Sequence, residues 1–210
     1  MHPKQIQTPL ILWFLFMLPI KTPAQEFNFG VVGGAALSDD FRSETSVATS
    51  LPGSLTVYTT THSNSKDYVV GGMFELGLPA RFSVELDGLY RPMNFTTSTS
   101  SVLGGVSPSN TVVTWEFPVL LKYRFQIPKA SPFFELGPSF RTAGNLNDTS
   151  PSNHGVAAGA GIGTSFRKIG ISAEGRYTRW SADQVSHPYE PRTNPDQVEF
   201  LTGWSFHRGN

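Results

Sequence analysis

The sequence predicts an all-β fold, an eight-stranded antiparallel, transmembrane, up-and-down β-barrel preceded by a cleaved signal peptide. Three observations lead to this prediction. Apolar and polar residues alternate with a period of two through most of the chain after Gln25, and no stretch shows a convincing helical period. Along the chain, the connections between these segments alternate between short and long. Aromatic residues gather near the ends of the apolar faces.

The first 24 residues have the three parts of a secretory signal peptide. Met1–Thr8 carries a lysine and no acidic residue, Pro9–Ile20 is an apolar run of twelve residues, and Thr22-Pro23-Ala24 offers small residues where a signal peptidase reads. A membrane anchor is the alternative, but a helix needs about 20 residues to span the ~30 Å hydrocarbon core. We therefore predict cleavage after Ala24, and a barrel domain of residues 25–210 without a transmembrane helix.

The composition excludes several functional classes. The 210 residues hold 16 basic and 16 acidic side chains, so the chain lacks the basic excess that marks a nucleic-acid-binding protein. The absence of cysteine excludes a disulfide scaffold, a zinc–thiolate site and a cysteine nucleophile. After signal cleavage the domain would carry 14 basic and 16 acidic groups, a net charge of −2.

Eight segments carry the alternating pattern that is typical of strands with two unlike faces. In residues 82–92, for example, Val84 and Leu86 share one face, while Glu85 and Asp87 occupy the other. The predicted strands are 27–37, 68–77, 82–92, 113–125, 133–141, 155–167, 169–179 and 197–207.

The predicted connections are short at one end of the barrel and long at the other. Short turns are expected at 78–81, 127–132 and 168–170, and long polar loops at 38–66, 96–110, 142–153 and 181–195. Of the 29 residues in 38–66, 13 are Ser or Thr. Short turns at one end and long polar loops at the other are typical of a transmembrane β-barrel.

Three predicted strands contain a proline, at Pro92, Pro118 and Pro138. Proline has no backbone N–H, so each one removes a hydrogen bond from the ladder between strands. Bulges or strand ends would have to accommodate these residues.

An alternating barrel can stand in water with its apolar face inward, or in a membrane with its apolar face outward. The aromatic residues favour the membrane, because on alternating up and down strands they fall into two groups that flank an aliphatic band. The turn-end group is Phe27, Phe29, Phe82, Tyr123, Phe125, Phe166, Trp204 and Phe206, and the loop-end group is Tyr68, Tyr90, Trp115, Phe140, Tyr177 and Phe200. Eight strands can also close without leaving an unpaired edge, which lipid requires.

The polar faces then line a narrow lumen, where an unpaired charge would be costly. The predicted lumen charges are Glu75, Glu85, Asp87, Glu116, Glu135, Glu174 and Glu199 with Arg91, Lys122, Arg124, Arg141, Arg167 and Arg176. Small residues such as Gly159, Gly161 and Gly163 share this face. The lumen could be a plug of ion pairs or a thin water path, and the small size of an eight-stranded barrel favours the plug.

Three segments resemble the small outer-membrane β-barrel proteins of Gram-negative bacteria, of OmpA/OmpX type, often described as porin-family outer-membrane barrel domains. They are residues 27–34 (FNFGVVGG), residues 115–125 (WEFPVLLKYRF) and the aromatic-ended last strand. In that family the last strand ends in an aromatic residue that the assembly machinery reads. Here the last aromatic residue, Phe206, is followed by four more residues, which departs from the pattern.

The resemblance implies a place in the outer membrane and a set of partners. These would be outer-membrane lipids and lipopolysaccharide, the outer-membrane assembly machinery and periplasmic chaperones. It also implies a monomer with no nucleic-acid partner.

No catalytic, cofactor-binding or metal-binding residue is predicted. Asp183, His187 and Glu190 could serve a lipid-modifying enzyme at the loop rim, as could Ser152 with His154, but solvated loop residues are the simpler interpretation. No two histidines stand at metal-ligand spacing.

The leading hypothesis is a non-enzymatic outer-membrane protein with a structural or surface-contact role. Its specificity would lie in residues 38–66 and 181–195, because function concentrates on loops carried by rigid scaffolds. The alternatives are a narrow porin-like channel for small solutes and an outer-membrane lipid-modifying enzyme.

Overall fold

A computed structural model describes residues 26–49, 56–63, 68–101, 104–127, 130–143, 152–182 and 192–207, and the predicted signal peptide lies outside these ranges. Eight of the eleven strands in this part of the chain form a barrel. They are β1 (Phe27–Ala36), β4 (Tyr68–Gly77), β5 (Phe82–Ser101), β7 (Ser109–Arg124), β8 (Ser131–Ala143), β9 (His154–Phe166), β10 (Ile169–Trp180) and β11 (Asp196–His207). Within the described ranges, no helix is both long enough and apolar enough to cross a bilayer.

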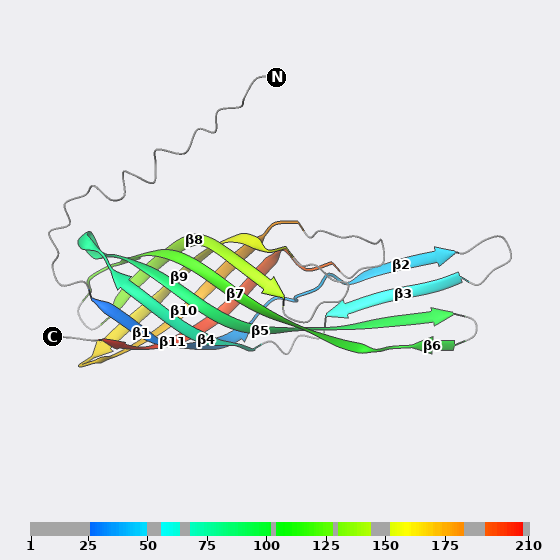
Figure 1. Ribbon diagram of the computed structural model, residues 1–210, viewed down its shortest axis with the longest axis horizontal. Helices are drawn as coiled ribbons and strands as arrows, with labels where there is room; N and C mark the ends of the chain where they lie inside the picture. The colour runs from blue at the N-terminus through cyan, green and yellow to red at the C-terminus, as the bar shows by residue number, and fades with distance from the viewer. Residues whose placement is uncertain are drawn as a thin grey trace, which may run out of the picture.

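The barrel closes because β1 pairs on one edge with β4 and on the other with β11. Each remaining barrel strand pairs antiparallel with the barrel strands before and after it along the chain. Every described barrel strand therefore has a partner on both edges, as lipid requires. The predicted eight-stranded antiparallel barrel is confirmed, and each of its strands overlaps a predicted segment (Figure 1).

Side chains alternate between a buried lumen face and an exposed outer face. In β7, Glu116 and Lys122 are each 2% exposed, whereas Trp115 and Leu121 are 43% and 50% exposed. Successive side chains of a strand point to opposite faces, so one register places most of the charges inside and most of the large apolar groups outside. This is the reverse of a soluble barrel, and the exposed apolar band needs lipid to cover it.

Aromatic rings contact one another around both ends of the outer face. At the turn end, the ring centroids of Phe82 and Tyr123 are 5.0 Å apart. At the loop end, the ring of Tyr90 lies 6.3 Å from that of Tyr68 and 5.5 Å from that of Trp115. These contacts link neighbouring strands into the two predicted girdles, which mark the boundaries of the hydrocarbon layer.

The barrel wall continues beyond the loop end as a sheet. β5 reaches Ser101, and β7 begins at Ser109, so this hairpin runs well past the predicted strand ends. β2 (Glu44–Thr49) and β3 (Thr56–Ser63) form a second hairpin that pairs with β5, and β6 (Gly104–Val106) pairs with the end of β5. Figure 1 shows these strands extending away from the barrel, opposite the end where β11 finishes.

The prediction that residues 38–66 and 96–110 are loops is therefore wrong over much of their length. We call β2, β3, β6 and residues 95–101 of β5 the surface sheet. Its strands are rich in Ser and Thr on both faces, as in the pairing of Thr60 with Ser98 and of Thr59 with Thr99. Threonine favours strands, but two polar faces give no apolar alternation by which a strand could be recognised.

The prolines interrupt the ladders without shifting the register. Between β5 and β7, two successive residue pairs are missing from the ladder, and one of them is Pro118 with Asp87. Between β7 and β8, two successive pairs are also missing, and one of them is Pro138 with Val119. The register is the same on both sides of each gap, so neither proline sits in a bulge or at a strand end. Pro92 pairs in register within the extended β5–β7 hairpin.

Candidate functional site: the charged lumen

A layer of ion pairs crosses the middle of the barrel. We call it the central layer, and it consists of Glu85, Asp87, Lys122, Glu135, Glu174 and Arg176. Lys122 lies with its Nζ 2.6 Å from Oε2 of Glu85 and 3.2 Å from Oε2 of Glu135. Because Glu85, Lys122 and Glu135 come from β5, β7 and β8, one ammonium group joins three strands.

Arg176 of β10 extends the central layer across the lumen. Its Nε donates to Glu135 Oε1 at 2.9 Å, its Nη1 to Asp87 Oδ2 at 2.7 Å, and its Nη2 to Glu174 Oε1 at 2.7 Å. The guanidinium is 2% exposed, so it is stabilised by these carboxylates rather than by water.

Three carboxylates of the central layer could in principle share a metal ion. One oxygen from each of Glu85, Glu135 and Glu174 lies within 4.8 Å of the others. Lys122 and Arg176 form ion pairs with all three, so the protein's own cations already occupy this cluster and offset two of its three negative charges.

An apolar layer lies next to the central layer on the loop side. Val32, Val69, Leu89 and Leu201 form one buried cluster, and Leu89 lies between Asp87 and Arg91 on the lumen face of β5. Sequence reasoning predicted a lumen of charged and small residues and missed this layer. Its large aliphatic side chains occupy the lumen between two sets of charges and exclude water there.

Beyond the apolar layer, a segment from outside the barrel wall enters the lumen. Asp40, which follows β1, accepts a hydrogen bond from Arg91 Nε at 3.1 Å and is fully buried. Arg91 also forms an ion pair with Glu199 of β11. Phe41 is 2% exposed and packs on Phe95, with ring centroids 4.7 Å apart. The segment around Asp40 and Phe41 therefore closes the loop end from within.

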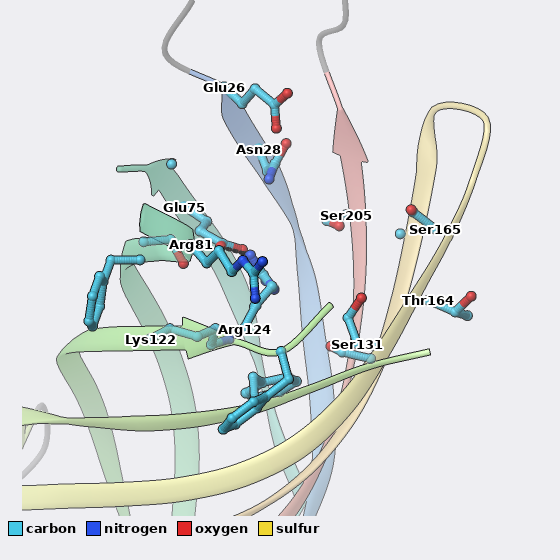
Figure 2. A pocket seen from close by; sticks show the side chains of 18 of the residues that line it. Glu26, Asn28, Glu75, Arg81, Lys122, Arg124, Ser131, Thr164, Ser165 and Ser205 are labelled. Atoms are coloured by element: carbon cyan, nitrogen blue, oxygen red, sulfur yellow. Dashed lines mark hydrogen bonds and ion pairs between the residues drawn. The ribbon is translucent and has the colours of Figure 1, made fainter. Parts of the chain in front are cut away.

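The turn end of the lumen opens instead into a vestibule of about 410 Å³. Figure 2 shows Glu75, Arg81 and Arg124 gathered on one side of this mouth, with Ser131 and Ser205 contributed by other strands. Arg124 Nη2 donates to Glu75 Oε2 at 2.7 Å. The inner limit of the vestibule is formed by Lys122 of the central layer, whose Nζ lies 4.3 Å from the ring centroid of Phe133.

Twelve of the thirteen predicted lumen charges face the lumen or its mouth, and one does not. Arg167 lies in the tight turn between β9 and β10 with a φ of 58°, is exposed, and stacks on the ring of Phe166. The strand ends before it, so the alternation used for the prediction no longer applies. Asp40, which sequence reasoning placed in a loop, is an additional lumen acid.

These changes alter the charge balance of the lumen. Apart from Glu26 and Arg81 at the rim of the vestibule, the described residues give it eight acids and five bases, rather than seven and six. The acids are Asp40, Glu75, Glu85, Asp87, Glu116, Glu135, Glu174 and Glu199, and the bases are Arg91, Lys122, Arg124, Arg141 and Arg176. A water path through this lumen would therefore favour cations over anions.

Glycine on β9 makes room for the central layer, as expected for a lumen face. A Cβ added at Gly159 would lie 2.6 Å from Glu135 Oε1, and one at Gly161 would lie 2.5 Å from Phe133 Cζ. The predicted role of these small residues as lumen positions is confirmed.

The candidate catalytic sets do not form a relay in the described residues. Ser152 accepts from Arg141 Nη2 at 3.1 Å, whereas His154 Nδ1 lies 2.8 Å from Asn153 Oδ1 and 3.5 Å from Ser181 Oγ. A serine–histidine relay uses one ring nitrogen for the hydroxyl and the other for the orienting group, and here both neighbours share Nδ1. Asp183, His187 and Glu190 lie outside the described residues.

Comparison with known proteins agrees with this architecture. The sequence model of the family described as outer membrane protein beta-barrel domain matches residues 10–207. The crystal structure of the outer membrane protein OprG from Pseudomonas aeruginosa is similar with a TM-score of 0.60, covering 89% of this chain and 97% of that chain at 14% sequence identity. At this identity the likeness concerns the fold alone. No curated protein matches the sequence.

Proposed function

Since this chain belongs to the outer membrane protein beta-barrel domain family and resides in the outer membrane, we propose that it acts there as a closed, non-enzymatic barrel that presents a contact surface outside the cell. The turn end would face the periplasm and the loop end the exterior, because barrels of this kind have short periplasmic turns and longer extracellular loops. The surface sheet would then project from the cell.

The observation that carries this proposal is the filling of the lumen. Three obstructions follow one another along β5. Glu85 belongs to the central layer, Leu89 to the apolar layer, and Arg91 binds the Asp40 segment. Each layer joins strands from different sides of the barrel, so we expect the charges to rigidify the wall instead of lining a channel. This arrangement supports the plug over the porin-like alternative.

The surface sheet supports the contact role. β3 carries Tyr58, which is 50% exposed, and β2 carries Val47, which is 55% exposed, in register opposite it. Hydroxyl groups lie beside this pair. Thr45 and Thr60, for example, are paired on the same two strands, and their hydroxyl groups form a hydrogen bond. An exposed aromatic group among hydroxyl groups on a sheet is suited to contacts with another surface. The second proposed contact segment, 181–195, is described only at its two ends.

We expect the partners implied by the family: outer-membrane lipids and lipopolysaccharide, the assembly machinery and periplasmic chaperones. The exposed outer ring of Phe206, 48% accessible near the end of β11, supports recognition of the last strand during assembly. The barrel would act as a monomer, with no nucleic-acid partner and no cofactor.

Replacement of residues 44–63 with a short Gly/Ser linker tests the contact role. The change removes β2 and β3 but keeps Asp40 and Phe41, so we expect the barrel to fold and to retain heat-modifiable mobility on gels. We expect cells that produce the full chain to aggregate and adhere, and cells that produce this variant to lose most of that aggregation and adhesion. Equal adhesion at equal surface abundance would contradict a contact role for the sheet.

A further inference from the structure

Three arginines line one hollow at the loop end of the barrel. Arg42, Arg179 and Arg192 are all exposed and surround a space of about 380 Å³, which Trp180 and Thr193 also line. Trp180 is 2% exposed and is held in place by the guanidinium of Arg141, which lies 4.2 Å from the centroid of the indole ring. The hollow therefore has a fixed wall.

Arg42 and Arg192 lie directly opposite each other on two paired segments. Phe41 forms an isolated antiparallel bridge with Thr193, and Arg42 N donates to Arg192 O at 2.9 Å. Phe41 and Thr193 are buried, whereas the next residue pair, Arg42 and Arg192, is exposed. Like charges opposite each other in an antiparallel pair destabilise it, with Cβ atoms ~5 Å apart.

The carboxylates near the hollow offset only part of this repulsion. Glu44 Oε2 is 4.0 Å from Arg192 Nε, and Asp196 forms an exposed ion pair with Arg179. Within the described ranges, no carboxylate lies within ion-pair distance of Arg42, and its electrostatic partner is Asp196, which lies further away and is paired with Arg179. An anion bound between Arg42 and Arg192 would remove the repulsion.

The hollow lies at the level of lipid headgroups. Arg179 follows Tyr177 by two residues on the outer face of β10, so it stands about 7 Å further along the strand than this girdle residue. Aromatic girdles mark the boundary between hydrocarbon and headgroups. Phosphate is, with carboxylate, one of the two anions whose geometry the planar guanidinium fork matches.

We propose that this hollow binds a phosphate group of an outer-leaflet lipid, the phosphorylated headgroup of lipopolysaccharide. The assignment rests on the proposed orientation, with the loop end outside. Arg42 and Arg192 would hold the phosphate between them, Arg179 would contact it from the side of the lipid, and the acyl chains would lie along the apolar outer face below. The site would anchor lipid beside the base of the surface sheet.

Titration of the refolded barrel in detergent micelles with diphosphoryl lipid A, followed by native mass spectrometry, tests this site. We expect Arg42→Gln/Arg192→Gln to raise the Kd for lipid A about tenfold, because two charge-assisted contacts to phosphate are lost. The matched control is Arg81→Gln/Arg167→Gln, which removes two exposed arginines at the opposite mouth, and it should change the Kd less than about twofold. Heat-modifiable mobility checks that both variants are folded.

Two further titrations separate the sources of phosphate. Dephosphorylated lipid A should bind the wild type and the Arg42→Gln/Arg192→Gln variant equally weakly, and millimolar inorganic phosphate should leave lipid A bound. Displacement by inorganic phosphate would overturn the lipid assignment, and equal weakening by both double variants would overturn the site. The assay measures neither adhesion nor orientation, so a negative result here leaves the proposed contact role standing.

Discussion

The Arg176→Met substitution is expected to lower the free energy of unfolding by about 3–5 kcal/mol, because it removes the cation shared by four buried carboxylates. Lys122 would remain as the cation of the central layer, and it cannot reach all four carboxylates in the geometry observed. Urea titration of the barrel in lipid vesicles, followed by tryptophan fluorescence and heat-modifiable mobility, measures the change.

Arg179→Met provides a control on the same strand. Its ion pair with Asp196 is exposed, with the two side chains 58% and 44% accessible, and its loss should cost less than about 1 kcal/mol. A loss from Arg176→Met as small as that from Arg179→Met would mean that the central layer does not stabilise the barrel.

Gly161→Ala is the second substitution with a large expected effect. Its new Cβ would lie 2.5 Å from Phe133 Cζ, 2.6 Å from the backbone oxygen of Ala173 and 2.7 Å from Glu174 Cβ. The backbone oxygen cannot move without disturbing the β9–β10 ladder, so we expect a loss of about 1–3 kcal/mol in the same urea titration. The outcome reports how tightly the lumen is packed beside the central layer.

Gly175→Ala is the matched change on the outer face. A Cβ there would meet nothing within 4 Å, so the substitution should leave stability unchanged or raise it slightly, because alanine is less flexible than glycine in the unfolded chain. If Gly161→Ala is tolerated as well as Gly175→Ala, the lumen has more free space than the structure indicates.

The barrel strands could be predicted from the sequence because their two faces meet very different surroundings. Lipid requires apolar side chains on one face, and a narrow lumen requires small or paired charged groups on the other, so the alternation in segments such as 82–92 is strong. The surface sheet has water on both faces. Its Thr and Ser residues fit a strand and a polar loop equally well, and only pairing with β5 reveals the strands.

The closure of the lumen could be predicted only in part. Alternation placed Glu85, Lys122 and Arg176 inside, but the entry of Asp40 depends on a contact with Arg91, 51 residues away along the chain. No local pattern marks such a contact. The error at Arg167 has a local cause, since a tight turn ends the alternation one residue before the predicted strand end.

The conductance of the purified barrel in planar bilayers shows whether the lumen is closed. Insertion is verified independently by heat-modifiable mobility of the protein recovered from the same lipid. With insertion verified, we expect a silent bilayer, because the central layer, the apolar layer and the Asp40 segment each block the path. Discrete current steps whose number grows with the amount of inserted protein would contradict a closed lumen and favour the porin-like channel.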